Sequence, residues 1–124
     1  MLYTGYYAYT KKYKEAGLVT VAISGVVPSF YEGYTVKEFA PRKETFNKWK
    51  NGELDNFGYT NEYREHLNSL NKEYIKALIS DFLKEGDVIF LCYEKSGEFC
   101  HRHILADWLE NTLQVGMVDE YKVK

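Results

Sequence analysis

Residues 88–108, VIFLCYEKSGEFCHRHILADW, decide the fold of this chain. Val88 to Tyr93 is a continuous apolar run, which is typical of a strand covered on both faces, as in a parallel sheet. The Lys-Ser-Gly after Glu94 predicts a loop, and from His101 the apolar residues recur at helical spacing. We therefore expect Cys100 at the start of a helix, just beyond the carboxyl end of a strand. Ligands usually bind at that edge of an open α/β sheet.

Flanking segments extend this pattern into a fold class. Residues 72–84 carry apolar side chains at the i, i+3, i+4 spacing of a helix that covers a core. Residues 18–24 are β-branched and mostly apolar, which predicts a central strand. Residues 1–4 predict a short first strand, and residues 116–124 predict a last edge strand. The alternation predicts a single three-layer α/β domain over residues 1–124, with a central, mainly parallel sheet and helices on both faces.

The middle of the chain predicts shorter helices. Tyr6 to Ala16 can form one short helix, and Arg42 to Lys50 predicts another with its aromatic residues on one face. Thr35 to Glu38 has the spacing of a capping box. Thr60 is a candidate cap for the next helix. Residues 25–35 form a long aromatic loop, and such loops often border a site.

Composition limits the classes of partner and of compartment. The formal net charge of −2 argues against nucleic acid as the main partner, because nucleic-acid-binding domains usually carry a basic stripe. No apolar run approaches the about 20 residues of a membrane span, and no secretory leader opens the sequence. The two cysteines are predicted to be thiols of a cytoplasmic protein. The 12 Tyr and 7 Phe suit a ring-bearing ligand, although most should simply complete a small core.

Three residues are candidate catalytic groups. Cys100, at a helix N-terminus, would be stabilised as a thiolate by unpaired N–H groups and the helix dipole; the alternative is a packed core cysteine. His101 could transfer protons near neutral pH, or it could pack against the core with a bond to a backbone group. Glu94, at the strand end, could act as an acid or base.

Arg102 has two interpretations that the sequence leaves open. Its planar guanidinium suits an anionic ligand, but it could instead pair with Glu94 or Glu98. Cys92 is expected to be a core thiol, on the same side of the sheet as Val88 and Phe90. Neighbouring Cys100 and His101 cannot easily converge on one tetrahedral ion, so we expect no metal site, and no motif predicts a cofactor.

The remaining strand ends should complete the same site if the sheet is parallel. They contribute polar and aromatic candidates for ligand binding: Tyr3, Thr4, Ser24, Gly25, Pro28, Phe30 and Tyr31.

Residues 91–110, LCYEKSGEFCHRHILADWLE, resemble the C-terminal motif of the family catalogued as domain of unknown function 488. In that motif a strand ends in Cys-x-Glu, and Cys-His-Arg opens a helix after a short loop. The similarity continues from Met1 through YTGYYAYTKKY and AISGVVPSFY, and so covers the whole chain. The resemblance implies an α/β fold and a functional site around Cys100, His101 and Arg102, but no established reaction.

These observations lead to one main functional hypothesis and two alternatives. The main hypothesis is an enzyme that acts on a small anionic, ring-bearing ligand of the nucleotide or nucleoside class. The first alternative is a module that binds or sequesters such a ligand without changing it. The second is a nucleic-acid-associated factor, which the net charge disfavours. The sequence does not determine the oligomeric state.

Overall fold

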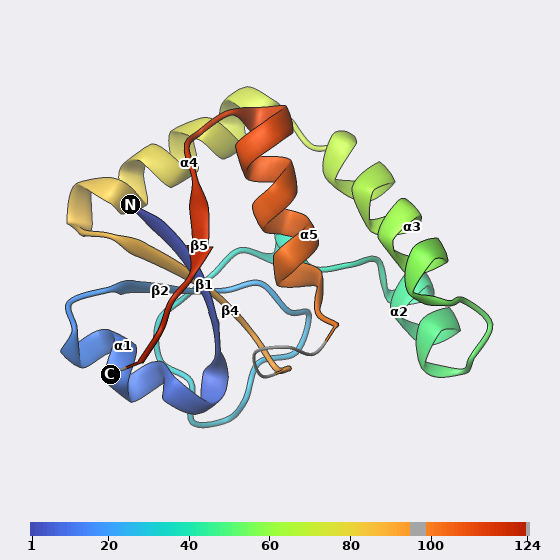
Figure 1. Cartoon of the computed structure of the whole chain (residues 1–124), viewed down its shortest axis with the longest axis horizontal. Coiled ribbons are helices and arrows are strands. Elements are labelled where there is room, and N and C mark those ends of the chain that lie inside the picture. The colour runs from blue at the N-terminus through green and yellow to red at the C-terminus, as the bar shows by residue number, and fades with distance from the viewer. Residues whose placement is uncertain (95–98, 124) are drawn as a thin grey trace.

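A five-stranded parallel sheet organises the computed structural model, which describes residues 1–94 and 99–123 (Figure 1). The strand order is β3-β2-β4-β1-β5. In chain order the strands are β1 (Leu2–Tyr6), β2 (Val19–Ala22), β3 (Tyr34–Thr35), β4 (Val88–Cys92) and β5 (Val118–Glu120). Each pairing between neighbouring strands is parallel, so the carboxyl ends of the strands meet at one edge. The predicted single α/β sheet is confirmed.

Strand β4 lies at the centre of the sheet, and all five of its residues are buried. It pairs with β1 on one side, where Tyr6 faces Cys92, and with β2 on the other, where Ala22 faces Leu91. The continuous apolar run in the sequence follows from this position, because a strand covered on both faces has no side that meets water.

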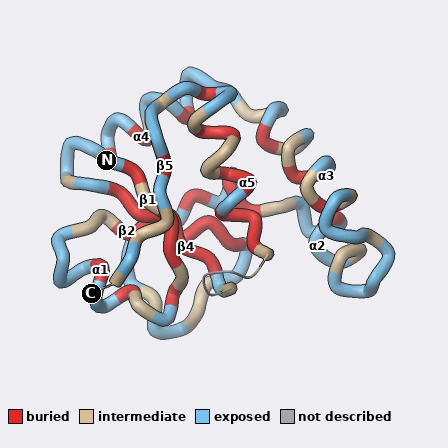
Figure 2. The backbone as a smooth tube through the Cα atoms, viewed as in Figure 1, coloured by how far each residue is buried: buried red, intermediate tan, exposed pale blue. Residues whose placement is uncertain are grey.

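Helices cover the two faces unequally (Figures 1 and 2). Val88, Phe90 and Cys92 point into a large core that also contains side chains of α3 (Asn56–Asn68), α4 (Lys72–Glu85) and α5 (His101–Trp108). Ile89 and Leu91 point into a smaller core beneath α1 (Thr10–Glu15). The three predicted layers are present, and Cys92 lies on the predicted side.

Shorter helical segments connect these elements. They are η1 (Tyr7–Tyr9), η2 (Lys37–Phe39), α2 (Lys43–Lys50) and the π-helix η3 (Leu109–Leu113), which continues α5. Within the described residues, no helix is both long enough and apolar enough to span a membrane.

Two predicted helix caps are wrong. The cap of α3 is Asp55, whose carboxylate accepts the Gly58 N–H at 2.7 Å, so the helix begins before Thr60. Thr60 instead lies inside α3, where its hydroxyl donates to the Asn56 carbonyl at 2.8 Å. The capping box of Thr35–Glu38 does not form, because this segment enters a short 3₁₀ turn with no side-chain cap.

Strand β1 is longer than predicted and ends at Tyr6 rather than at Thr4. Gly5 does not stop the strand; it makes room for α1. A Cβ at Gly5 would lie 2.6 Å from the Tyr13 hydroxyl oxygen and 2.8 Å from Ile89 Cδ1. The residue that suggests a strand end in the sequence is a point of close packing in the structure.

Candidate functional site

A cavity of about 730 Å³ opens at the carboxyl edge of the sheet. Its wall combines the segments that follow β2 and β4, the start of α5, and the helices α2 and α3. The lining residues are Ser24, Gly25, Val26, Pro41, Lys43, Phe46, Asn47, Trp49, Lys50, Tyr59, Tyr93, Glu94, Phe99, Cys100 and His101. The expected location of the site is thus a real cavity, and it contains Cys100, His101, Glu94, Ser24 and Gly25 from the sequence prediction.

Aromatic rings form one wall of this cavity. The Trp49 ring centroid lies 5.3 Å from that of Tyr59 and 5.8 Å from that of Phe99, and the Tyr59 and Phe99 centroids are 5.4 Å apart. Lys43 and Lys50, at the two ends of α2, add positive charge to the lining. Stacking rings next to ammonium groups suit a planar ligand that carries negative charge.

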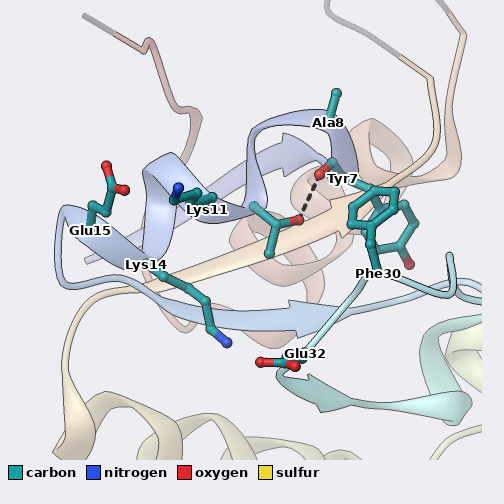
Figure 3. Close-up of a pocket in the computed structure, with 8 residues that line it drawn as sticks. Tyr7, Ala8, Lys11, Lys14, Glu15, Phe30 and Glu32 are labelled. Carbon is teal, nitrogen blue, oxygen red and sulfur yellow. Dashed lines mark hydrogen bonds between the residues drawn. The ribbon is translucent and has the colours of Figure 1, made fainter.

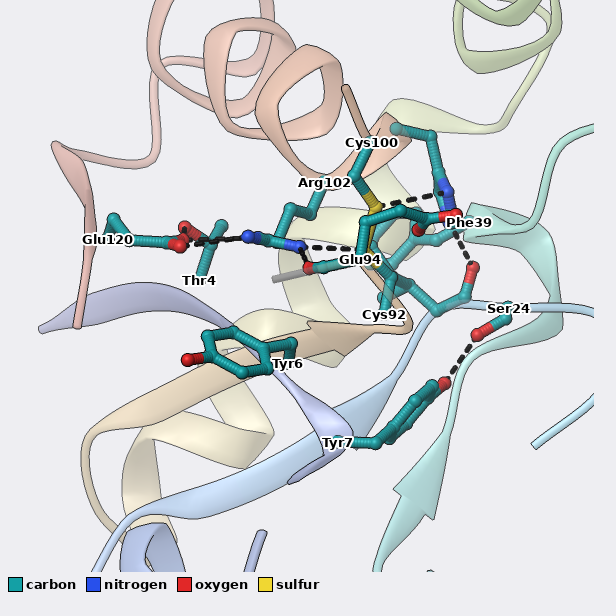
Figure 4. The surroundings of a disulfide bond; sticks show 12 residues. Thr4, Tyr6, Tyr7, Ser24, Phe39, Cys92, Glu94, Cys100, Arg102 and Glu120 are labelled. Carbon is teal, nitrogen blue, oxygen red and sulfur yellow. Dashed lines mark hydrogen bonds and ion pairs between the residues drawn. A yellow bond between two sulfur atoms is a disulfide. The ribbon is translucent and has the colours of Figure 1, made fainter. Parts of the chain in front are cut away.

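Cys100 lies in the wall of the cavity and forms a disulfide with Cys92, with the two Cα atoms 7.3 Å apart (Figure 4). The prediction that both residues are thiols is therefore wrong for the state that the structure holds. Cys92 ends β4 on the face that α5 covers, and Cys100 caps the start of α5. These two positions meet because α5 packs against β4, and spacing in the sequence does not reveal that packing.

His101 is buried, and its ring nitrogens have different environments. Its Nε2–H donates to the Ile23 carbonyl at 2.8 Å, because a carbonyl oxygen can only accept. The lone pair of Nδ1 is then available to the sulfur of Cys100, 3.8 Å away. Burial lowers the pKa of His101 to about 4, and the nearby Arg102 cation acts in the same direction. The ring is neutral at physiological pH, in the packed, backbone-bonded arrangement that the sequence left open.

Arg102 is fully buried and makes an ion pair with Glu120 (Figure 4). Its Nε and Nη2 donate to the two carboxylate oxygens of Glu120 at 3.1 and 2.9 Å. Its Nη1 donates to Cys92 Sγ at 3.2 Å and to the Glu94 carbonyl oxygen. Arg102 therefore takes the ion-pair arrangement, but with a partner on β5 rather than with Glu94; Glu98 lies outside the described residues.

Tyr7 is a site residue that sequence reasoning missed. Its hydroxyl oxygen lies 2.5 Å from Ser24 Oγ, and this contact joins the end of β1 to the segment after β2 (Figure 4). Burial raises the pKa of Tyr7 to about 12, so the phenol stays protonated. Because Ser24 lines the cavity, Tyr7 holds a lining residue in position through this contact.

The other predicted ligand-binding residues lie away from this cavity. Thr4 donates to Glu120 Oε1 at 2.6 Å, inside the sheet, and the Tyr3 hydroxyl contacts Met1 Sδ at 3.5 Å. Phe30 lines a separate pocket of about 570 Å³ between α1 and the loop after β2 (Figure 3). Pro28 and Tyr31 help to fold that loop: the Pro28 carbonyl accepts the Tyr31 N–H at 3.0 Å.

Residues of α2 and α3 complete the cavity in places that the sequence did not indicate. Phe46 and Trp49 were correctly placed on one face of a helix, but that face borders the cavity, and Phe46 is 40% exposed. The signal available in the sequence was a pair of aromatic residues on one face of a short helix that is otherwise polar. Tyr59, which precedes the predicted cap Thr60, lies in the first turn of α3.

A possible donor set for a metal ion appears within the described residues. Donor atoms of Cys92, Cys100 and His101 all lie within 4.8 Å of one another, so neighbouring Cys and His do converge here. The two sulfurs are bonded to each other in this state, however, and a disulfide offers no thiolate ligands. The structure therefore assigns no metal ligands.

Comparison with known proteins identified one family. The model of DUF488-N3a, described as the active DUF488-N3 subclade, matches residues 8–113, which begin within η1 and end with the last residue of η3. The search of curated proteins and the search of solved structures found no match.

Proposed function

Because the chain belongs to the DUF488-N3a family, and because its Cys100 forms part of a cavity wall, we propose that the protein is an enzyme that acts on a nucleotide or nucleoside-like molecule. One observation carries the proposal: the sulfur of Cys100 shares a cavity with a cluster of stacking rings and two lysines. The cavity volume, about 730 Å³, is within the range of small-molecule sites.

The lining supports a ligand that is both planar and anionic. Trp49, Tyr59 and Phe99 offer ring faces and edges, which bind a base or another flat ring. Lys43 and Lys50 can neutralise a phosphate or carboxylate group on the same molecule. The two lysines therefore take the anion-binding role that the sequence first suggested for Arg102, because the charge of Arg102 is already balanced by Glu120.

Catalysis would begin from the reduced chain, with Cys100 as the nucleophile. The N–H groups at the start of α5 favour the thiolate. The sulfur would bond to an electrophilic atom of the ligand, while the leaving group departs with its bonding pair and takes a proton from water. A second water molecule would then attack that atom, and the bond to sulfur would break to return the Cys100 thiolate. His101, neutral and bonded to Ile23, orients the thiol through Nδ1 rather than removing its proton.

The need for a reduced cysteine also supports a cytoplasmic location as part of the proposal, because the cytoplasm keeps thiols reduced.

A binding module remains the second candidate, and a specific observation favours it. Two of the three groups of the Cys-His-Arg motif are held by the protein itself, His101 by Ile23 and Arg102 by Glu120. A site that only grips its ligand needs no free acid or base. A nucleic-acid-associated factor is a weaker candidate, because the net charge is −2.

The test measures binding and turnover of the same molecules. Reduced protein is titrated with nucleosides and with nucleoside mono- and triphosphates, and calorimetry gives the affinity. We expect Trp49→Leu to weaken binding at least about fivefold, because one stacking contact is worth about 1–3 kcal/mol. We expect Lys50→Gln to weaken binding by at least about the same factor, because it removes a positive charge from the lining. Lys11→Gln, in the separate pocket, is the matched control.

Chromatography of each ligand after prolonged incubation then separates catalysis from binding. We expect conversion by the wild-type protein and none by Cys100→Ser, which should retain its affinity. Intact recovery of every ligand that binds, together with no reduction of a disulfide compound, would establish the binding module instead. If no nucleoside or nucleotide binds, the proposed ligand class is wrong.

A further inference from the structure

The two sulfurs of the site have different surroundings. Cys100 belongs to the cavity wall, whereas Cys92 is fully buried behind it at the end of β4. Cys92 receives a hydrogen bond from Arg102 Nη1 at 3.2 Å. The guanidinium cannot easily move away, because Glu120 holds its Nε and Nη2. One sulfur can thus meet a ligand, and the other is supported only by the protein.

A single nucleophile would not require this arrangement. After reduction, a fixed guanidinium N–H beside Cys92 favours its thiolate, which is the reactive form of a cysteine. That thiolate would lie within bonding reach of Cys100, because the two sulfurs are bonded in the structure. The geometry provides an internal thiol that can attack anything attached to Cys100.

We propose that Cys92 is a second reacting thiol, and that the reaction is the two-electron reduction of a ring-bearing, anionic molecule with a disulfide bond. This inference rests on the proposed function for its cavity and ligand class, and it adds the reaction type. The Cys92–Cys100 disulfide in the structure is then the product state of the protein.

The reaction balances in two steps. The Cys100 thiolate attacks one sulfur of the substrate R–S–S–R, forms a mixed disulfide, and releases one RS⁻. The Cys92 thiolate then attacks Cys100 Sγ, forms the internal disulfide, and releases the second RS⁻. Two cysteines are oxidised, one substrate disulfide is reduced, and the two cysteine protons pass to solvent or to the thiolate products. An external dithiol must restore the reduced protein by exchange.

A suitable probe is 5,5′-dithiobis(2-nitrobenzoate), an anionic aryl disulfide that releases a coloured thiolate. Reduced, desalted wild-type protein should release two thiolates per chain and end with the Cys92–Cys100 disulfide and no adduct. Cys92→Ala should release one and keep a stable adduct on Cys100, which intact-mass measurement detects. Cys100→Ser should react at least about tenfold more slowly, because the remaining thiol is buried.

Bis(2-hydroxyethyl) disulfide, which is neutral and lacks a ring, is the control substrate. Trp49→Leu should slow the reaction with the aryl probe about fivefold or more, as loss of one stacking contact predicts, and should slow the reaction with the control substrate by a smaller factor. Lys11→Gln should affect neither. Circular dichroism of each variant confirms that it is folded.

Three results would overturn the inference. One is a stable mixed disulfide on the wild-type protein, and another is Cys92→Ala that behaves as the wild type does. The third is purified protein in which a metal ion blocks both thiols. If nucleotides bind but no internal disulfide forms, the reaction type is wrong and the proposed function stands. If Trp49→Leu slows the reaction by the same factor with both substrates, the ring-bearing ligand class is wrong and the dithiol reaction stands.

Discussion

At the scale of single residues, the Arg102–Glu120 pair joins the start of α5 to β5. Arg102 is fully buried, and Glu120 also accepts a hydrogen bond from Thr4 on β1. Removing one partner of a buried pair leaves an uncompensated charge. We expect Glu120→Gln to lower the free energy of unfolding by about 3 kcal/mol, measured by urea denaturation. Asp119→Asn, its exposed neighbour on β5, should change it by less than about 0.5 kcal/mol. Equal effects of the two substitutions would contradict a structural role for the pair.

His101 predicts a pH dependence of stability. Its pKa is about 4 in the folded chain, against 6.5 for an ordinary histidine, because burial disfavours the cation. Between these values the unfolded chain binds more protons, so the free energy of unfolding should rise with pH. Stability should be complete above pH 6.5 and fall by about 3 kcal/mol as the pH decreases to 4.

Urea denaturation at several pH values between 6.5 and 5 tests this expectation. The range lies above the pKa values of Asp107 and Glu62, which their hydrogen bonds to neighbouring groups lower further. His101→Gln should lose most of the slope, and His103→Gln, at an exposed site, should keep most of it. An unchanged slope in His101→Gln would show that another group is responsible.

At the scale of elements, α3 depends on a cap that the sequence misplaced. Asp55 satisfies the Gly58 N–H at the helix start, whereas the Thr60 hydroxyl bonds a carbonyl within the helix. Asp55→Ala should lower the free energy of unfolding by about 1 kcal/mol. Thr60→Ala should lower the free energy of unfolding by less than about 0.5 kcal/mol, because α3 keeps its backbone hydrogen bonds. A larger loss for Thr60→Ala, measured by thermal denaturation, would place the helix start where the sequence first suggested.

At the scale of the whole molecule, stability should be lowest where the cavity wall is formed. All five residues of β4 are buried, but Thr45 is the buried residue of α2. Backbone amides of β4 should therefore exchange with solvent only through global unfolding, and those of α2 through local opening. Hydrogen exchange measured by mass spectrometry checks this order, with α4, which has three buried residues, in between. Equal protection of α2 and β4 would show that α2 is part of the cooperative core.

The sequence by itself determined the class of fold, and it predicted that the candidate site residues lie at the carboxyl edge of the sheet. The apolar run of β4 and the stripe of α4 are local patterns, since burial imposes a period on each element separately. Parallel pairing follows from the alternation of elements, and it brings the ends of β2 and β4 to one edge. Cys100, His101 and Glu94 could therefore be assigned to one site, and the family resemblance over Cys-His-Arg is confirmed.

Only the tertiary structure decided what those residues contact. The pairing of Arg102 with Glu120, the bond between Cys92 and Cys100, and the neutral state of His101 depend on side chains from different elements. Likewise, Trp49 belongs to the site because α2 packs beside α3 and the Trp49 ring meets Phe99, not because of its neighbours in the chain. Such contacts follow from the packing of whole elements against the sheet, which no local pattern encodes.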